Sequence, residues 1–107
     1  MDFEEILKQL KESLLQLLAE RYDEYKSESK KDINDFLNSS KIKLDRWTKL
    51  LVTGIISLEE FEWLLNSQKD ILELKTLQKA GISKISLGHM RNSIISTIVN
   101  VIRTVVL

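Results

Sequence analysis

A short turn between two helical patterns constrains this chain more than any other stretch of its sequence. Gly54 follows an apolar helical run, where a residue in the left-handed conformation commonly ends a helix. Ser57 and Glu60 then have the spacing of a capping box, in which each side chain accepts a hydrogen bond from the other residue's backbone amide. Ile56 and Phe61 flank this cap at the spacing of a hydrophobic staple. These residues together predict a helix–turn–helix corner.

Helices should also make up the rest of the chain, because few of its residues break helices. The 107 residues include no proline and only three glycines. A chain of this length is sufficient for one modest domain. We therefore predict a single all-α domain over residues 1–107.

An apolar stripe at helical spacing runs through the first half of the chain. It returns after a polar segment at 26–32, which contains no strong helix stop. Two interpretations are open: one helix over 2–53, or two helices with a bend near 26–40. The single helix is favoured, with roughly 50 residues and a length of about 75 Å. Its first part carries the stripe residues Phe3, Leu7, Leu10, Leu14 and Leu17.

The favoured long helix has a consequence for assembly. The remaining residues are too few to cover its whole stripe, so we expect the stripe to pair with another chain. The predicted architecture is an oligomeric bundle or a coiled coil, most simply a homo-oligomer. In that arrangement the stripe residues at the start of the chain form part of an interface.

The second half of the chain should contain two further helices. We predict a second helix at 57–80 that runs antiparallel to the end of the first, a linker at 81–86 and a C-terminal helix at 87–106. The C-terminal helix has a thin polar line, so it should be covered on most of its circumference. We expect its interface residues to be Ile94, Ile98, Val101, Ile102 and Val105.

The sequence offers little for catalysis or for metal binding. It contains no cysteine and a single histidine, His89, which excludes disulfides, thiolate sites and histidine clusters within one chain. Adjacent glutamates at 4–5 and 59–60 are explained as partners of helix dipoles and as caps. There is no glycine-rich phosphate loop. We therefore predict a protein that is not an enzyme, with no catalytic residue, cofactor or metal.

The charge distribution bears on the partners and on the location of the protein. The 16 basic and 16 acidic residues balance, whereas nucleic-acid binding is typical of a basic excess, so we expect no nucleic acid. The acidic N-terminus differs from a secretory signal, which favours a cytoplasmic protein. No acidic residue follows Glu73, although five basic residues do. A basic, apolar end of this kind raises an alternative in which the last helix lies on an anionic membrane.

The corner resembles a known bacterial family. Residues 54–62 read Gly-Ile-Ile-Ser-Leu-Glu-Glu-Phe-Glu, and Leu50, Leu51, Leu64 and Leu65 surround them. Over residues 50–65 this pattern is similar to the helical hairpin of short C-terminal (SHOCT) domains. The resemblance implies a bacterial hairpin that mediates oligomerisation or attachment and has no catalytic role. Ser57 stands where that family usually has threonine, the chain continues well beyond the hairpin, and the resemblance assigns no binding residues.

Two hypotheses about function follow from these observations. In the first, the protein is a non-enzymatic helical scaffold or adaptor that acts through self-association or by binding a protein partner. In the alternative, it is a peripheral membrane protein that uses its apolar C-terminal helix.

Overall fold

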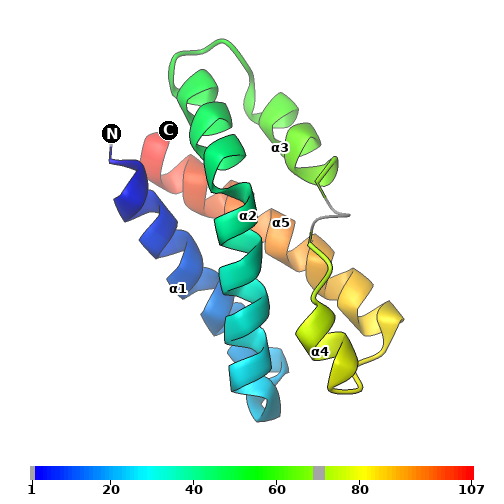
Figure 1. Ribbon diagram of the computed structural model, residues 1–107. Coiled ribbons are helices and arrows are strands. Elements are labelled where there is room, and N and C mark those ends of the chain that lie inside the picture. Colours follow the sequence, from blue (N-terminus) through cyan, green and yellow to red (C-terminus); the bar gives the residue numbers. More distant parts are fainter. Residues whose placement is uncertain (1, 69–71) are drawn as a thin grey trace.

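The computed structural model of the chain describes residues 2–68 and 72–107, and it confirms an all-α fold (Figure 1). Within these ranges, every regular element is helical. The elements are α1 (Phe3–Arg21), the 3-10 turn η1 (Asp23–Tyr25), α2 (Lys26–Val52), α3 (Leu58–Asn66), α4 (Lys75–Lys79) and α5 (Lys84–Val106).

The chain reverses direction between α1 and α2, so the favoured single helix over 2–53 is wrong. The break lies at Tyr22 and η1, just before the 26–40 window in which a bend was the other interpretation, and α2 runs through that window without interruption. The reversal lets the stripes of α1 and α2 cover each other, and Leu10, Leu14 and Ile33 are fully buried. Burial contributes about 1.5–3 kcal/mol for each large aliphatic side chain. A few such residues outweigh the helical hydrogen bonds lost at the break, which contribute about 1 kcal/mol each.

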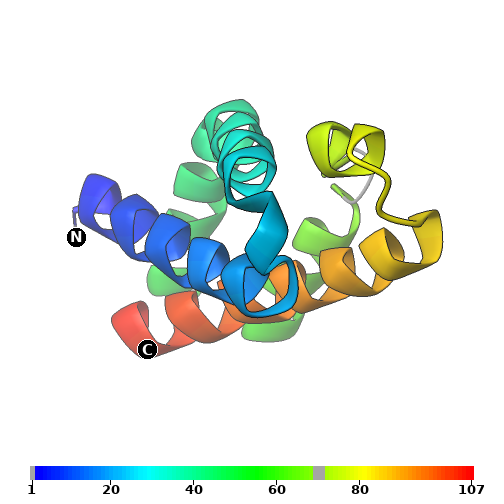
Figure 2. The same ribbon diagram turned by 90° about the horizontal axis from the view of Figure 1, so that it is seen from below.

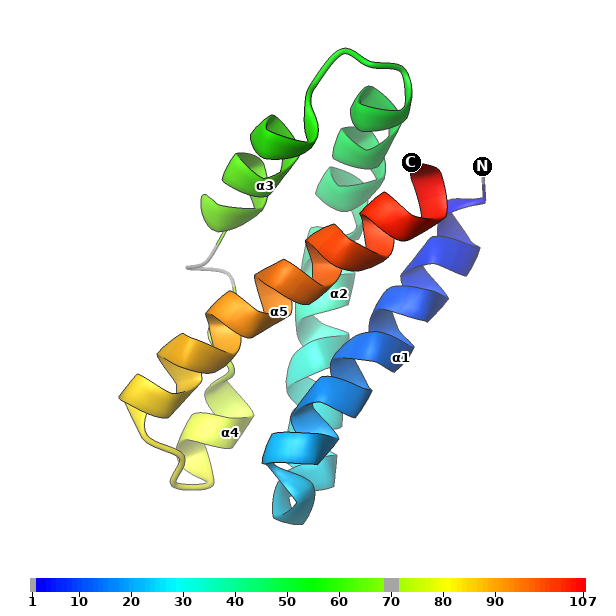
Figure 3. The ribbon, with the colours of Figure 1, turned by 180° about the vertical axis from the view of Figure 1, so that it is seen from behind.

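Helix α5 closes the core by packing on both α1 and α3. Figure 2 shows α2 nearly end-on, with α1 and α5 on one side of it, and Figure 3 shows α5 crossing the molecule diagonally. The buried face of α5 includes Met90, Ile94, Ile98 and Ile102. The helix begins at Lys84 rather than at 87, because the Ser83 hydroxyl caps it by accepting from the Ser86 amide (3.1 Å). The predicted linker at 81–86 was therefore too long.

The predicted second helix at 57–80 is also wrong, because α3 ends at Asn66 and the separate helix α4 begins only at Lys75. Part of the interval, residues 69–71, lies outside the described residues. Leu72 and Leu74 are both buried, and Leu74 has a left-handed backbone with φ +50°. Residues two apart in an α-helix point in nearly opposite directions. The non-helical backbone at residues 72–74 buries both leucines, and a straight helix would have exposed one of them.

At the corner between α2 and α3, Gly54 has a φ of +78°, which is a conformation that glycine adopts without steric cost. The Glu60 amide donates to the Ser57 hydroxyl (3.1 Å), and the Ser57 amide donates to the Glu60 carboxylate (3.0 Å). Phe61 is fully buried, while Ile56 is half-buried against the same core. The corner therefore sets where α3 meets α5.

Candidate interaction surface

The predicted interface residues lie mostly inside one chain. The buried members are Phe3, Leu10, Leu14, Ile94, Ile98 and Ile102, and the half-buried members that pack on the same core are Leu7, Leu17 and Val101. Because α1 folds back on α2 and α5, one chain covers most of its own stripe, and the stripe does not require a second chain. The homo-oligomer stays a prediction. Val105 differs from the others, since 40% of it is exposed.

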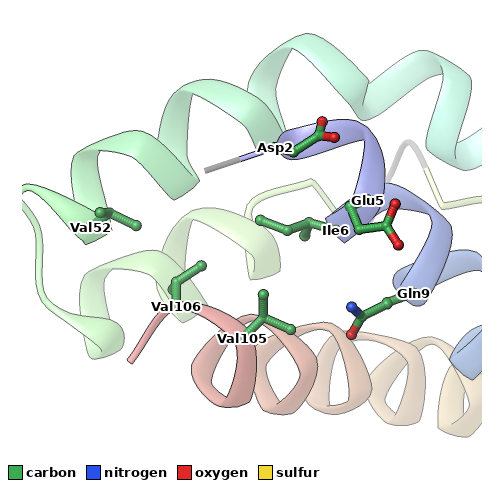
Figure 4. A pocket seen from close by; sticks show the side chains of 7 residues that line it. All are labelled: Asp2, Glu5, Ile6, Gln9, Val52, Val105 and Val106. Atoms are coloured by element: carbon green, nitrogen blue, oxygen red, sulfur yellow. The ribbon is translucent and has the colours of Figure 1, made fainter.

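Val105 lines an apolar hollow at the end of the molecule where α1 begins and where α2 and α5 end (Figure 4). We call this site the terminal hollow. Its volume is about 390 Å³. The aliphatic side chains around it are Ile6, Val52, Val105 and Val106, and the polar residues are Asp2, Glu5 and Gln9. Val52 is 45% exposed, so apolar surface faces solvent from two different helices.

The rim of the terminal hollow is acidic. Asp2 is the N-cap of α1, and its carboxylate accepts from the Glu4 amide (3.0 Å). Glu4 itself pairs with Lys41 on α2, with 2.6 Å between the charged atoms. Glu5 makes no ion pair with any residue in 2–68 or 72–107. An apolar floor below the carboxylates of Asp2 and Glu5 suits an aliphatic side chain that stands next to a cation.

A surface of the opposite character lies at the other end of α5. Ile85, in the first turn of α5, is 78% exposed, and Lys84 beside it is also exposed. Lys79 at the end of α4 adds positive charge just before this turn, whereas Glu73 offsets the charge of Lys75. The hydrogen bond that Lys75 donates to the Glu73 carboxylate, together with the negative charge of that carboxylate, raises the pKa of Lys75, and the two side chains form an ion pair (2.8 Å). We call Lys75, Lys79, Lys84 and Ile85 the basic corner.

Other exposed apolar side chains stand singly on other elements. Ile42 lies on α2, Ile55 in the corner and Trp63 on α3. Isolated apolar residues are normal on the surface of a folded protein and need no partner. Ile42 is useful as a control position, because it is 76% exposed and does not line the terminal hollow.

Two charged side chains hold the connection around α4. Asp32 of α2 is only 6% exposed, and its two carboxylate oxygens accept from the amides of Thr76 (3.0 Å) and Leu77 (2.8 Å). Arg91 of α5 donates from Nε to the Leu72 carbonyl (2.6 Å) and from Nη2 to the Glu73 carbonyl (3.0 Å). Since α4 has no side-chain cap of its own, Asp32 takes the place of one. Both residues therefore have structural roles.

Residues considered for chemistry are spread over the described part of the molecule. His89 is exposed on α5, and Glu60 is engaged in the capping box. Within 2–68 and 72–107, no three histidine or acidic side chains come close enough to hold a metal ion. None of the helices described has both the length and the apolar character needed to cross a membrane.

Sequence reasoning did not find the terminal hollow, except for Val105. The hollow depends on how three helix ends align, and no local pattern encodes that alignment. Comparison with family models, curated proteins and solved structures gives no match to this chain. The likeness of residues 50–65 to the SHOCT hairpin stays a prediction.

Proposed function

We propose that this protein is a non-enzymatic helical interaction module, a scaffold or adaptor that binds a protein segment in its terminal hollow. The observation that carries the proposal is the apolar hollow whose rim holds Asp2 and Glu5, of which Glu5 has no ion pair with any residue in 2–68 or 72–107. The expected partner presents an aliphatic side chain next to lysine or arginine, because the aliphatic group fits the floor and the cation faces Glu5.

Each residue in such a contact contributes little to the free energy of binding. Full burial of one aliphatic side chain contributes about 1.5–3 kcal/mol. A solvent-exposed ion pair at the rim adds about 0.2–1 kcal/mol. The sum is about 1.7–4 kcal/mol, so the dissociation constant is millimolar at best. The module therefore works through transient binding, or through repeated contacts in an assembly.

The membrane alternative has lost its main support, which was the apolar character of the C-terminal helix. Ile94, Ile98 and Ile102 are buried against the rest of the chain, so this face of α5 is already covered. A membrane would meet only the remaining, more polar surface of the helix. We therefore favour protein binding.

The test is a titration followed by methyl NMR. The probe is the capped peptide acetyl-Gly-Lys-Ile-Lys-Gly-amide, and the control is the same peptide with glutamate in place of both lysines. We expect the basic peptide to shift the methyl signals of Val52, Val105 and Val106 and to leave Ile42 unchanged. The acidic peptide should have little effect, because its charges face the carboxylates of the rim.

Two results would count against this function. Equal shifts with both peptides would show that the rim does not select charge. Shifts centred on Ile42 or Ile55 would place binding at another surface. A Val105→Asp variant serves as the binding-deficient reference, and Ile42→Asp is its matched control, since both positions are exposed valine or isoleucine residues on helices.

A further inference from the structure

We infer that the occupant of the terminal hollow is the basic corner of a second copy of this chain, with Ile85 inserted between the helix ends. This inference rests on the proposed function and adds the identity of the partner. The structure contains both halves of the contact, an apolar hollow with carboxylates and an exposed aliphatic side chain with lysines.

The side chain of Ile85 protrudes from the surface of α5. Residues three apart on a helix are neighbours, and the neighbour of Ile85 in that direction is Gly88, which has no side chain. No atom other than those of its own helix backbone and chain neighbours lies within 4 Å of the position that a Cβ of Gly88 would take. Ile85 therefore stands clear of the helix on that side, and a hollow can receive it without a steric clash.

The charges favour this pairing over a symmetric one. Two hollows placed face to face would bring Asp2 and Glu5 of one chain toward the same carboxylates of the other. The basic corner instead brings Lys84, next to Ile85, to the rim, together with Lys79 of α4. Like charges in contact select against a partner, whereas opposite charges steer the correct encounter.

The positions of the two surfaces determine the kind of assembly. The terminal hollow lies where α5 ends, and the basic corner lies where α5 begins. Figure 3 shows that α5 spans the molecule between these two ends. The 23 residues of α5 separate the two surfaces by about 34 Å. One chain therefore cannot fill its own hollow. The contact is heterologous, so copies join head to tail into rows that extend or close into a ring.

The experiment measures mass against concentration by light scattering and by sedimentation, with three variants of the full chain. The series extends into the millimolar range, because the contact is weak. Ile85→Asp removes the protruding side chain, Val105→Asp blocks the hollow, and Ile42→Asp is the control. We expect the wild type and Ile42→Asp to gain mass with concentration. Ile85→Asp and Val105→Asp should each stay monomeric, with association weakened at least tenfold.

Mixing the two defective variants gives the sharpest result. Ile85→Asp keeps an intact terminal hollow, and Val105→Asp keeps an intact basic corner. These two surfaces can pair once, so the mixture should form dimers that cannot grow further. A symmetric interface would not be restored in this way. Charge reversal provides a second check: Lys84→Glu should weaken association, and Glu5→Lys on the other copy should recover part of it.

Several outcomes would overturn the inference, and they separate it from the proposed function. If the wild type is monomeric at every concentration while the basic peptide binds the hollow, the occupant is another protein and the proposed function stands. If association is lost in Val105→Asp but survives in Ile85→Asp, another segment fills the hollow. If association survives in both variants, the copies associate through another surface and the inference fails, while the peptide titration still decides the proposed function. Circular dichroism checks folding, and Val52→Asp replaces Val105→Asp if that variant unfolds.

Discussion

Replacement of Asp32 by alanine tests how far one side chain holds the α4 region in place. The carboxylate accepts hydrogen bonds from two amides that have no other cap, at 3.0 and 2.8 Å. Loss of a helix cap costs about 0.5–2 kcal/mol. Each buried amide left without a partner costs about 1–3 kcal/mol more. Because the Asp32 side chain borders a solvent-open hollow of about 200 Å³, water will satisfy part of this loss.

We therefore expect Asp32→Ala to lower the free energy of unfolding by about 2–4 kcal/mol. This is a large share of the roughly 5–15 kcal/mol that stabilises a typical domain. Urea denaturation followed by far-UV circular dichroism measures it, and amide exchange reports whether Thr76 and Leu77 lose protection first. Asp32→Asn should cost less, since its amide group keeps one acceptor oxygen.

Asp35→Ala is the matched control for this experiment. Asp35 lies on the same helix and is exposed, where it pairs with Lys31 (3.0 Å). An exposed pair of this kind contributes about 0–1 kcal/mol. If Asp32→Ala and Asp35→Ala have the same stability within error, the cap contributes nothing and the reasoning is refuted.

Three further substitutions test the corner between α2 and α3, the hydrogen bonds of Arg91 near α4, and the break between α1 and α2. Gly54→Val should lower stability by about 1–3 kcal/mol, because valine is strained at φ +78°, and an unchanged melting temperature would contradict this. Arg91→Met should cost about 1.5–3 kcal/mol, as measured in urea, because two carbonyls lose a charged donor. Tyr22→Phe should cost about 0.5–1.5 kcal/mol, because the hydroxyl bond to Ser86 Oγ (2.7 Å) is lost; a melting curve that matches the wild type would show that this bond is not needed.

The all-α fold and the corner could be predicted because their signals are local. Glycine, a capping serine and a glutamate three residues later satisfy backbone groups within a few residues of themselves. The C-terminal helix was predictable for a related reason, since its apolar residues repeat at helical spacing over five turns or more.

The two breaks in the helices could not be predicted, because contacts far away in the sequence decide them. Nothing near Tyr22 stops a helix, and the reversal there is stabilised by burial of α1 against α2 and α5. The α4 region depends on Asp32, which lies 44 residues before Thr76, and on Arg91, which lies 19 residues after Leu72. The terminal hollow could not be predicted for the same reason, because residues from both ends of the chain and from its middle line it.

The position of the terminal hollow affects how this protein should be handled in the laboratory. Asp2 and Val106 both line it, and the two chain ends emerge at that side of the molecule (Figure 3). An affinity tag or a fluorescent protein fused at either end would start beside the hollow and would compete with any partner for it. Cleaved, untagged protein is therefore the proper material for binding and mass measurements, and labels are better attached at an exposed side-chain position such as Trp63 on α3.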